Sequence, residues 1–299
     1  MVTFTIDAKT GKLTPLRPGP LADSMAYVAT DRSGKFLLSA SYGGNKVTVN
    51  PIGPDGVVQA AQQIMTTQPN AHCIVVDPSN RYVLHTSLGG DLVYQEKFDA
   101  KTGKLTPNDP PSVSVKAKAG PRHLVFSPGK KFVYLLNELD ASIYVFPWDA
   151  KTGTLGKEVQ VTTSLPKGFE GKPWAADIHL TPDGRVSLRL RTHHQHACRI
   201  WGRSQEGITD ADRFYPTEKQ PRGFSIDPTG RYLLSVGQLS NSMTSYAIDK
   251  ATGKLTKLKE YPDRQEPELG RDRRFLAVER RLAARGRSFG RISLMAAAS

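Results

Sequence analysis

A strand–turn–strand unit recurs along this chain and restricts its fold more than any other feature. Each copy has an apolar strand, a short turn rich in Asp, Ser, Pro and Gly, and a second apolar strand. The turns end at Phe36, Tyr82, Phe132, Val186 and Tyr232, which lie 46, 50, 54 and 46 residues apart. Such a period, built from short strands, is typical of a β-propeller with one four-stranded blade per repeat. A helical solenoid is disfavoured because no window keeps an apolar period of 3.6 residues.

A second motif marks the point where each unit closes. It begins with Asp, continues to Thr-Gly and ends on Leu, and it stands within residues 6–15, 98–107, 148–155 and 248–256. The two motifs together define a partial blade, five further blades and a place for one more. The repeat therefore predicts an all-β, seven-bladed β-propeller over residues 1–262, truncated at its N-terminal strands.

The net charge of +13 raises the possibility of a nucleic-acid ligand, but its distribution argues against one. Two segments with Arg and no Lys, residues 186–205 and 263–299, each contribute a net +4. The rest of the chain carries only +5. We therefore expect no nucleic-acid partner.

The repeat is lost in these same two segments. The fourth unit requires an apolar second strand, but the chain reads VSLRLRTHHQHACRIWGRS. A one-base shift of a suitable reverse translation restores strand-like sequence in both places. We expect that 186–205 is out of frame and that 263–299 is a frameshifted, Arg-rich tail in place of the closing blade. His193, His194 and His196 are then not metal ligands, and we expect neither a metal nor a cofactor.

Cysteine content and hydropathy indicate the compartment. Cys73 and Cys198 fall in different repeats and suggest no disulfide framework, so a reducing, cytoplasmic location is expected. Residues after Met1 read as a strand rather than a leader, and no apolar run approaches the roughly 18 residues that a membrane span needs. No membrane partner is expected, and the oligomeric state stays open.

Equivalent positions of successive blades form rings around a propeller's axis, and here these positions are rich in polar residues. They precede the first strand or follow the second strand of each unit, so an antiparallel hairpin brings them to the rim opposite the turns. In particular, Arg122 should lie near Glu138. The polar residues of this rim are His72, Arg122, His123, Glu138, Asp177, Arg222 and Gln238, with His179 on the same strand face as Asp177.

A purely structural interpretation competes with a functional one. Charged groups flanking apolar strands need either partners or a ligand. Arg122 and Arg222 would, on the structural interpretation, only pair with Glu138 and Asp177 to join blades. Elsewhere, we assign His85 to the surface, and Trp148 and Trp174 to packing between blades, with a pocket as the alternative for Trp174.

Four segments carry a resemblance to a known family. They are AHCIVVDPSNRYV, GPRHLVFSPGKKFVYLLNELDASIYVF, WAADIHLTPDGR and PTEKQPRGFSIDPTGRYLL, in that order. The chain resembles the seven-bladed β-propeller lactonases over about residues 1–185 and 207–262. One arginine of the family pattern falls at Thr192 here, so one cationic group of that pattern is missing from this sequence.

The resemblance implies a site and a reaction. It implies catalytic roles for Glu138, His72 and Arg122, and substrate binding by Arg222, Asp177, His179, His123 and Gln238. The implied reaction is cofactor-free hydrolysis of 6-phospho-D-glucono-1,5-lactone, a small anionic sugar lactone, to 6-phosphogluconate in the pentose phosphate pathway. Such chemistry needs a base for water, a cation for the oxyanion and an anion clamp. The alternatives are a carboxymuconate-type lactonizing enzyme and a non-catalytic propeller that binds a protein or small anion.

Overall fold

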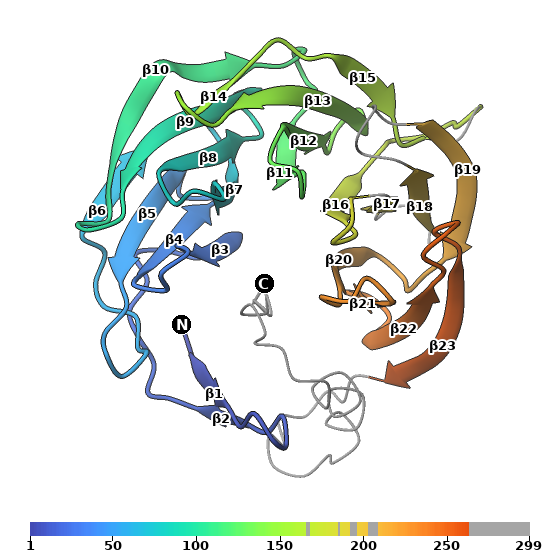
Figure 1. Cartoon of the computed structure of the whole chain (residues 1–299), viewed down its shortest axis with the longest axis horizontal. Coiled ribbons are helices and arrows are strands. Elements are labelled where there is room, and N and C mark those ends of the chain that lie inside the picture. Colours follow the sequence, from blue (N-terminus) through green and yellow to red (C-terminus); the bar gives the residue numbers. More distant parts are fainter. Residues whose placement is uncertain (166–167, 185, 192–195, 203–208, 263–299) are drawn as a thin grey trace.

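The chain forms a ring of antiparallel sheets around a central axis (Figure 1). The computed structural model describes residues 1–165, 168–184, 186–191, 196–202 and 209–262, and within 186–214 it describes only the backbone. Five blades follow one another around the ring, and a two-stranded sheet, β1 (Phe4–Ile6) with β2 (Leu13–Pro15), precedes them. The all-β propeller predicted from the repeat is confirmed.

Within each blade, strands that are consecutive in the chain pair from the axis outward. In the third blade, both β14 and β15 pair with β13. The strands are β3 (Tyr27–Thr30), β4 (Phe36–Ser41), β5 (Lys46–Pro51), β6 (Gln63–Thr66); β7 (Ala71–Val76), β8 (Tyr82–Ser87), β9 (Leu92–Asp99), β10 (Lys104–Ser114); β11 (Pro121–Phe126), β12 (Phe132–Asn137), β13 (Ser142–Asp149), β14 (Thr154–Leu155), β15 (Gln160–Thr163); β16 (Ala175–Leu180), β17 (Val186–Arg191), β18 (His196–Gly202), β19 (Thr209–Pro216); and β20 (Pro221–Ile226), β21 (Tyr232–Gly237), β22 (Ser242–Ile248), β23 (Leu255–Pro262).

The repeated turns are held by their first polar side chain. In the second blade, Asp77 Oδ1 accepts hydrogen bonds from the amides of Arg81 and Tyr82, at 2.8 and 2.9 Å, and Oδ2 accepts from the Ser79 amide at 2.8 Å. An aspartate that binds its own turn in this way fixes the hairpin locally. Equivalent residues do the same in other blades: Asp31, Ser127 and Asp227.

The closing motif joins each blade to the one before it. Gly103, in the second blade, has a positive φ of 75°, and a Cβ there would collide with the ring of Phe36 in the first blade. Gly153 has the same relation to Tyr82. Only glycine fits such a close approach with a positive φ. The two sequence motifs recur together because one packs on the other.

The apolar core lies between neighbouring blades. Successive residues of a strand face opposite sides of a sheet. On β8, Val83 therefore packs toward the first blade with Leu38, whereas Leu84 packs toward the third blade with Leu135. Trp148 belongs to this second cluster and is buried, as predicted.

Four inner strands carry a β-bulge at the end where they begin. The register shifts between Ala71 and Ile74 on β7, and across Arg122 on β11, Ala176 on β16 and Arg222 on β20. A bulge adds one residue that has no partner on the neighbouring strand and redirects side chains. The predicted ring positions thus coincide with the places where pairing is interrupted.

One prediction for the chain ends and the irregular segments meets a different outcome, and the others are not tested by the structure. The N-terminal segment forms a pair of short strands, not a single one. Residues 186–191 and 196–202 form β17 and β18, which pair with each other. That this segment is out of frame stays a prediction. The assignments of Thr192, of the histidine cluster at 193–194 and of the tail at 263–299 lie outside the described residues.

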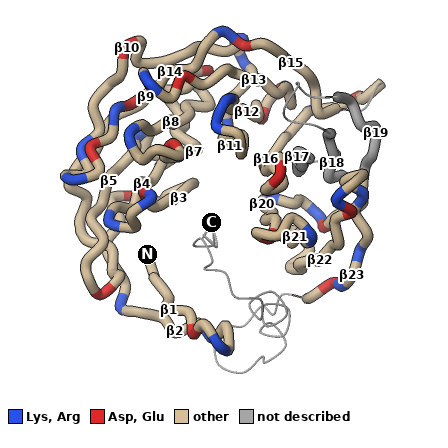
Figure 2. The backbone as a smooth tube through the Cα atoms, viewed as in Figure 1, with Lys and Arg blue, Asp and Glu red and all other residues tan. Residues whose placement is uncertain are grey.

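One side-chain assignment was wrong. His85 is buried, with 1% of its surface exposed, because it stacks on Tyr94 at 4.6 Å and lies 3.4 Å from Glu96. Trp174 is 37% exposed, and its assignment to packing or to a pocket stays a prediction. None of the described segments forms a helix with the length and hydropathy needed to cross a bilayer. Around the described ring, basic and acidic residues alternate (Figure 2).

Candidate active site

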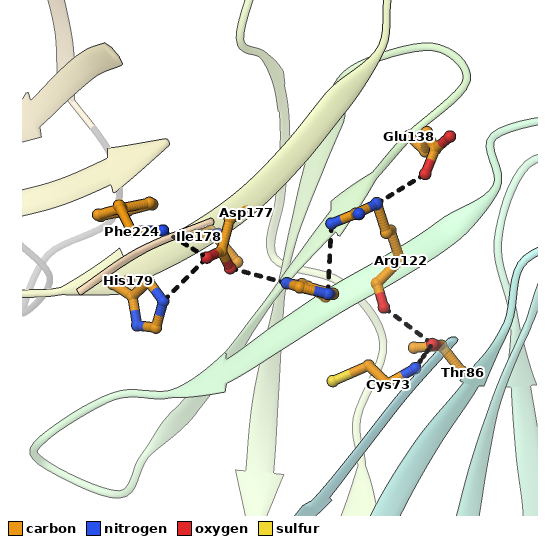
Figure 3. A network of polar contacts seen from close by, with 9 residues as sticks. Cys73, Thr86, Arg122, Glu138, Asp177, Ile178, His179 and Phe224 are labelled. Carbon is orange, nitrogen blue, oxygen red and sulfur yellow. Dashed lines mark hydrogen bonds and ion pairs between the residues drawn. The ribbon is translucent and has the colours of Figure 1, made fainter. Parts of the chain in front are cut away.

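A chain of polar contacts crosses the axial rim from one blade to the next (Figure 3). It begins at Glu138, which directly follows β12. Glu138 Oε2 accepts a 2.7 Å hydrogen bond from Arg122 Nε on β11. Arg122 Nη1 lies 3.2 Å from His123 Nε2, and His123 Nδ1 lies 2.7 Å from Asp177 Oδ1 on β16. The predicted proximity of Arg122 and Glu138 is confirmed.

Asp177 is the inner anchor of this chain. Its Oδ1 accepts from His123 Nδ1 and, at 2.9 Å, from the amide of Ile178; its Oδ2 accepts from His179 Nε2 and from the Phe224 amide, both at 3.2 Å. Burial alone would raise the pKa of Asp177, but the charge and hydrogen bonds of His179 and His123 outweigh it and lower that pKa below its usual value. Asp177 is therefore a carboxylate.

The two histidines on Asp177 differ in protonation. Burial, reinforced by the Arg122 charge, lowers the pKa of His123 to about 4, so its imidazole is neutral. Burial also opposes charge on His179, but the Asp177 carboxylate prevails and raises its pKa. His179 keeps 39% of its side chain exposed, whereas that of His123 is 9% exposed.

His72 lies beside this chain, in the bulge of β7. Its ring meets the rings of Tyr42 and His123 edge to face, at 5.7 and 5.2 Å. Burial, together with the Arg122 charge, holds its pKa well below the usual value. His72 Nδ1 is buried and has no hydrogen-bond partner among the described residues. A neutral, buried ring with one unpartnered nitrogen thus lies beside the polar chain.

Arg222 and Gln238 come from the fifth blade. Arg222 is exposed. Its positive charge contributes to lowering the pKa of Arg122 and of His72, and it opposes the increase that burial causes in the pKa of Tyr42. It forms no ion pair with any residue that the structure describes. Gln238 is exposed; its side chain accepts a 3.3 Å hydrogen bond from Gln220 Nε2, and its amide donates to the Gln220 carbonyl at 3.0 Å. The structure therefore brings Arg222 to the mouth but does not join Gln238 to the polar chain.

The structural alternative from the sequence is half right. Arg122 does pair with Glu138, at 2.7 Å. Asp177, however, pairs with His123 and His179 rather than with Arg222. One arginine of the rim is thus paired with a protein carboxylate, and the other has no ion pair among the described residues.

Sequence reasoning missed one supporting residue, Thr86. Its Oγ1 accepts a 3.0 Å hydrogen bond from the Cys73 amide and donates to the carbonyl of Arg122 at 2.9 Å (Figure 3). The bulge in β7 deprives the Cys73 amide of its ladder partner, and the threonine replaces it. In the stretch YVLHTS, Thr86 stands between His85 and Ser87, and no pattern in the sequence sets it apart from these two polar neighbours.

The comparisons with known proteins agree with this architecture. Residues 1–269 match the family model "Lactonase, 7-bladed beta-propeller". The 6-phosphogluconolactonase of Pectobacterium carotovorum is 40% identical over 268 residues, covering 89% of this chain and 80% of the relative. That of Serratia proteamaculans is 39% identical over 263 residues, covering 88% and 78%.

Solved structures give the same result. A candidate 6-phosphogluconolactonase from Bacteroides fragilis superposes with a TM-score of 0.79 at 28% identity. The periplasmic gluconolactonase PpgL of Pseudomonas aeruginosa gives a TM-score of 0.79 at 26% identity. Each match covers 88% of this chain and 77% of the other. This chain belongs to the seven-bladed β-propeller lactonase family.

Proposed function

We propose that this chain hydrolyses 6-phospho-D-glucono-1,5-lactone to 6-phosphogluconate. The observation that carries the proposal is the rim where a buried Arg–carboxylate pair, a neutral histidine and an uncommitted arginine meet. The names of the relatives at 39–40% identity support the same substrate. The reaction belongs to the pentose phosphate pathway, and we place it in the cytoplasm.

Glu138 is the proposed general base. Arg122 holds its Oε2, and the side chain is 14% exposed, so Oε1 has access to a water molecule. His72 is the weaker candidate, because the lowered pKa of its ring makes it a poor proton acceptor.

Arg122 is the proposed oxyanion group. Its Nε and Nη1 are held by Glu138 and His123, and Nη2 has no partner among the described residues. Water attack on the lactone carbonyl places negative charge on the carbonyl oxygen, and a fixed cation stabilises that charge. Arg222 binds the phosphate through its exposed guanidinium.

The test measures hydrolysis of freshly prepared phosphorylated lactone above its spontaneous rate. Glu138→Gln should reduce kcat on the order of 10²-fold or more and leave KM nearly unchanged, because the shape is kept and the base is lost. Arg222→Ala should raise KM for the phosphorylated lactone but not for glucono-1,5-lactone itself.

Three outcomes would overturn the proposal. Turnover of a carboxymuconate lactone without turnover of the phosphorylated lactone would assign the arginines to a carboxylate substrate. Saturable binding without any turnover would make this a binding propeller. Unchanged kinetics in both variants would return the rim to a structural role.

A further inference from the structure

We infer that Asp177 and His123 are positioning residues that hold the Arg122 guanidinium, and that they do not bind substrate. The inference rests on the proposed function, in which Arg122 faces the lactone carbonyl. It replaces the substrate-binding role that the resemblance implied for both residues.

Asp177 has no capacity left for a ligand. A carboxylate offers about four lone-pair sites. Those of Asp177 are occupied by His123, His179 and two backbone amides, at 2.7 to 3.2 Å, and its side chain is 10% exposed. A substrate hydroxyl would have to displace one of these donors.

The carboxylate also decides which nitrogen of His123 carries the proton. Asp177 only accepts, so the proton of the neutral ring lies on Nδ1. His123 Nε2 then presents a lone pair to Arg122 Nη1, 3.2 Å away. With the proton on Nε2 instead, two N–H groups would face each other at that distance, and Arg122 would be pushed away.

The guanidinium is therefore held by two groups, and the backbone of the same residue by a third. Glu138 binds Nε and His123 binds Nη1, while the Arg122 carbonyl accepts from Thr86 of the preceding blade. Asp177 in turn is held by the Phe224 amide of the following blade. If the His123 acceptor is removed, Glu138 is the one remaining described group that restricts rotation of the Arg122 guanidinium.

The experiment compares His123→Phe with His123→Gln. Phenylalanine keeps the ring contacts with Tyr27 and His72 but offers no acceptor, so kcat should fall on the order of 10²-fold at a KM within a few-fold of wild type, the effect of a misplaced catalytic group. Glutamine supplies both an acceptor and a donor and should recover much of that loss.

His85→Phe is the matched control. It removes another buried histidine beside a carboxylate. The described side-chain contacts of His85, with Glu96 and Tyr94, include no residue of the rim, so the substitution should leave the kcat of the folded protein unchanged. An equal loss of kcat in His85→Phe and His123→Phe would overturn the inference. A raised KM at unchanged kcat in His123→Phe would do the same, since it would return His123 to substrate binding.

A second measurement keeps the inference separate from the proposed function. Nitrogen-15 NMR of the side chains should show His123 protonated only on Nδ1, and separate Nη signals for a held Arg122. In His123→Phe the Nη signals should merge as the guanidinium rotates. Absence of lactone turnover with these spectra would overturn the function alone, whereas a wild-type Arg122 that already rotates would overturn the positioning role.

Discussion

Two buried histidine–carboxylate pairs in this molecule have very different surroundings. At the rim, His123 and Asp177 meet at 2.7 Å across two blades, and all their nitrogen and oxygen atoms have partners. Within one blade, His85 and Glu96 meet at 3.4 Å, and His85 Nδ1 and Glu96 Oε2 have no partner among the described residues. The rim pair joins the innermost strands of two blades, β11 and β16, whereas His85 and Glu96 lie on the second and third strands of one blade, β8 and β9.

The difference shows that burial of a titratable pair does not by itself mark a site. The rim pair is one link in a chain that reaches the partly exposed Glu138. In the second pair, here called the inner pair, His85 stacks on Tyr94, and among the described residues no side-chain hydrogen bond leads from His85 or Glu96 to another group. Continuity of hydrogen bonds to an accessible group is the better sign of function, because a fully connected network fixes orientation.

The largest expected effect is on stability. Asp177→Asn puts an amide N–H opposite donors that the carboxylate now accepts, so the free energy of unfolding should fall by about 3–5 kcal/mol. Glu96→Gln disturbs one long contact and should cost only about 1 kcal/mol. Urea denaturation of both variants checks this. Equal losses would mean that the two pairs are energetically alike.

A smaller effect is the dependence of stability on pH. The pKa of His123 is about 4 in the folded state and about 6.5 in the unfolded state, and that of His72 is lowered too. Below pH 6.5 the unfolded chain therefore binds protons that these folded rings refuse, and stability falls by at most about 1.4 kcal/mol per pH unit for each ring.

The two other titrating groups of the rim act differently. The raised pKa of His179 gives a contribution that is complete below pH 6.5 and is lost as pH rises through its folded value, so it partly offsets the decline. The lowered pKa of Asp177 keeps its contribution intact above its unfolded value of 3.8. Melting temperatures from pH 7 to 4 should thus fall, less in His123→Phe and more in His179→Gln. The reverse order would contradict the assigned protonation states.

The smallest expected effect is the change in stability when His85 and Glu96, the inner pair, are replaced together. His85→Phe combined with Glu96→Met replaces both partners by apolar groups of similar size, and stability should change by no more than about 1 kcal/mol. The matching double change at His123 and Asp177 would strand the Phe224 amide and should cost several times as much. A large loss in the inner double variant, seen by urea denaturation, would show that His85 and Glu96 have partners beyond the described residues.

The sequence predicted the fold well because the repeat is explicit in its turns. It also placed Arg122 beside Glu138, since a hairpin dictates that proximity. It did not predict the partners of Asp177, because contacts between blades depend on how neighbouring sheets are rotated, which no local pattern encodes. His85 was misplaced for a related reason: a histidine between apolar residues gives no sign of which stacking partner covers it.

Because of the bulges in the inner strands, the residues that build the sheet are different from the residues inserted beside the axis. The residues that flank them pair across the ladder, whereas the inserted residues on β11, β16 and β20 have no ladder partner: Arg122, Ala176 and Arg222. Arg122 and Ala176 are buried, but Arg222 is exposed, so a substitution at Arg222 changes what faces the axis with little disturbance of the sheet. A propeller built this way is able to exchange one anionic substrate for another through an exposed inserted position while every blade keeps its shape.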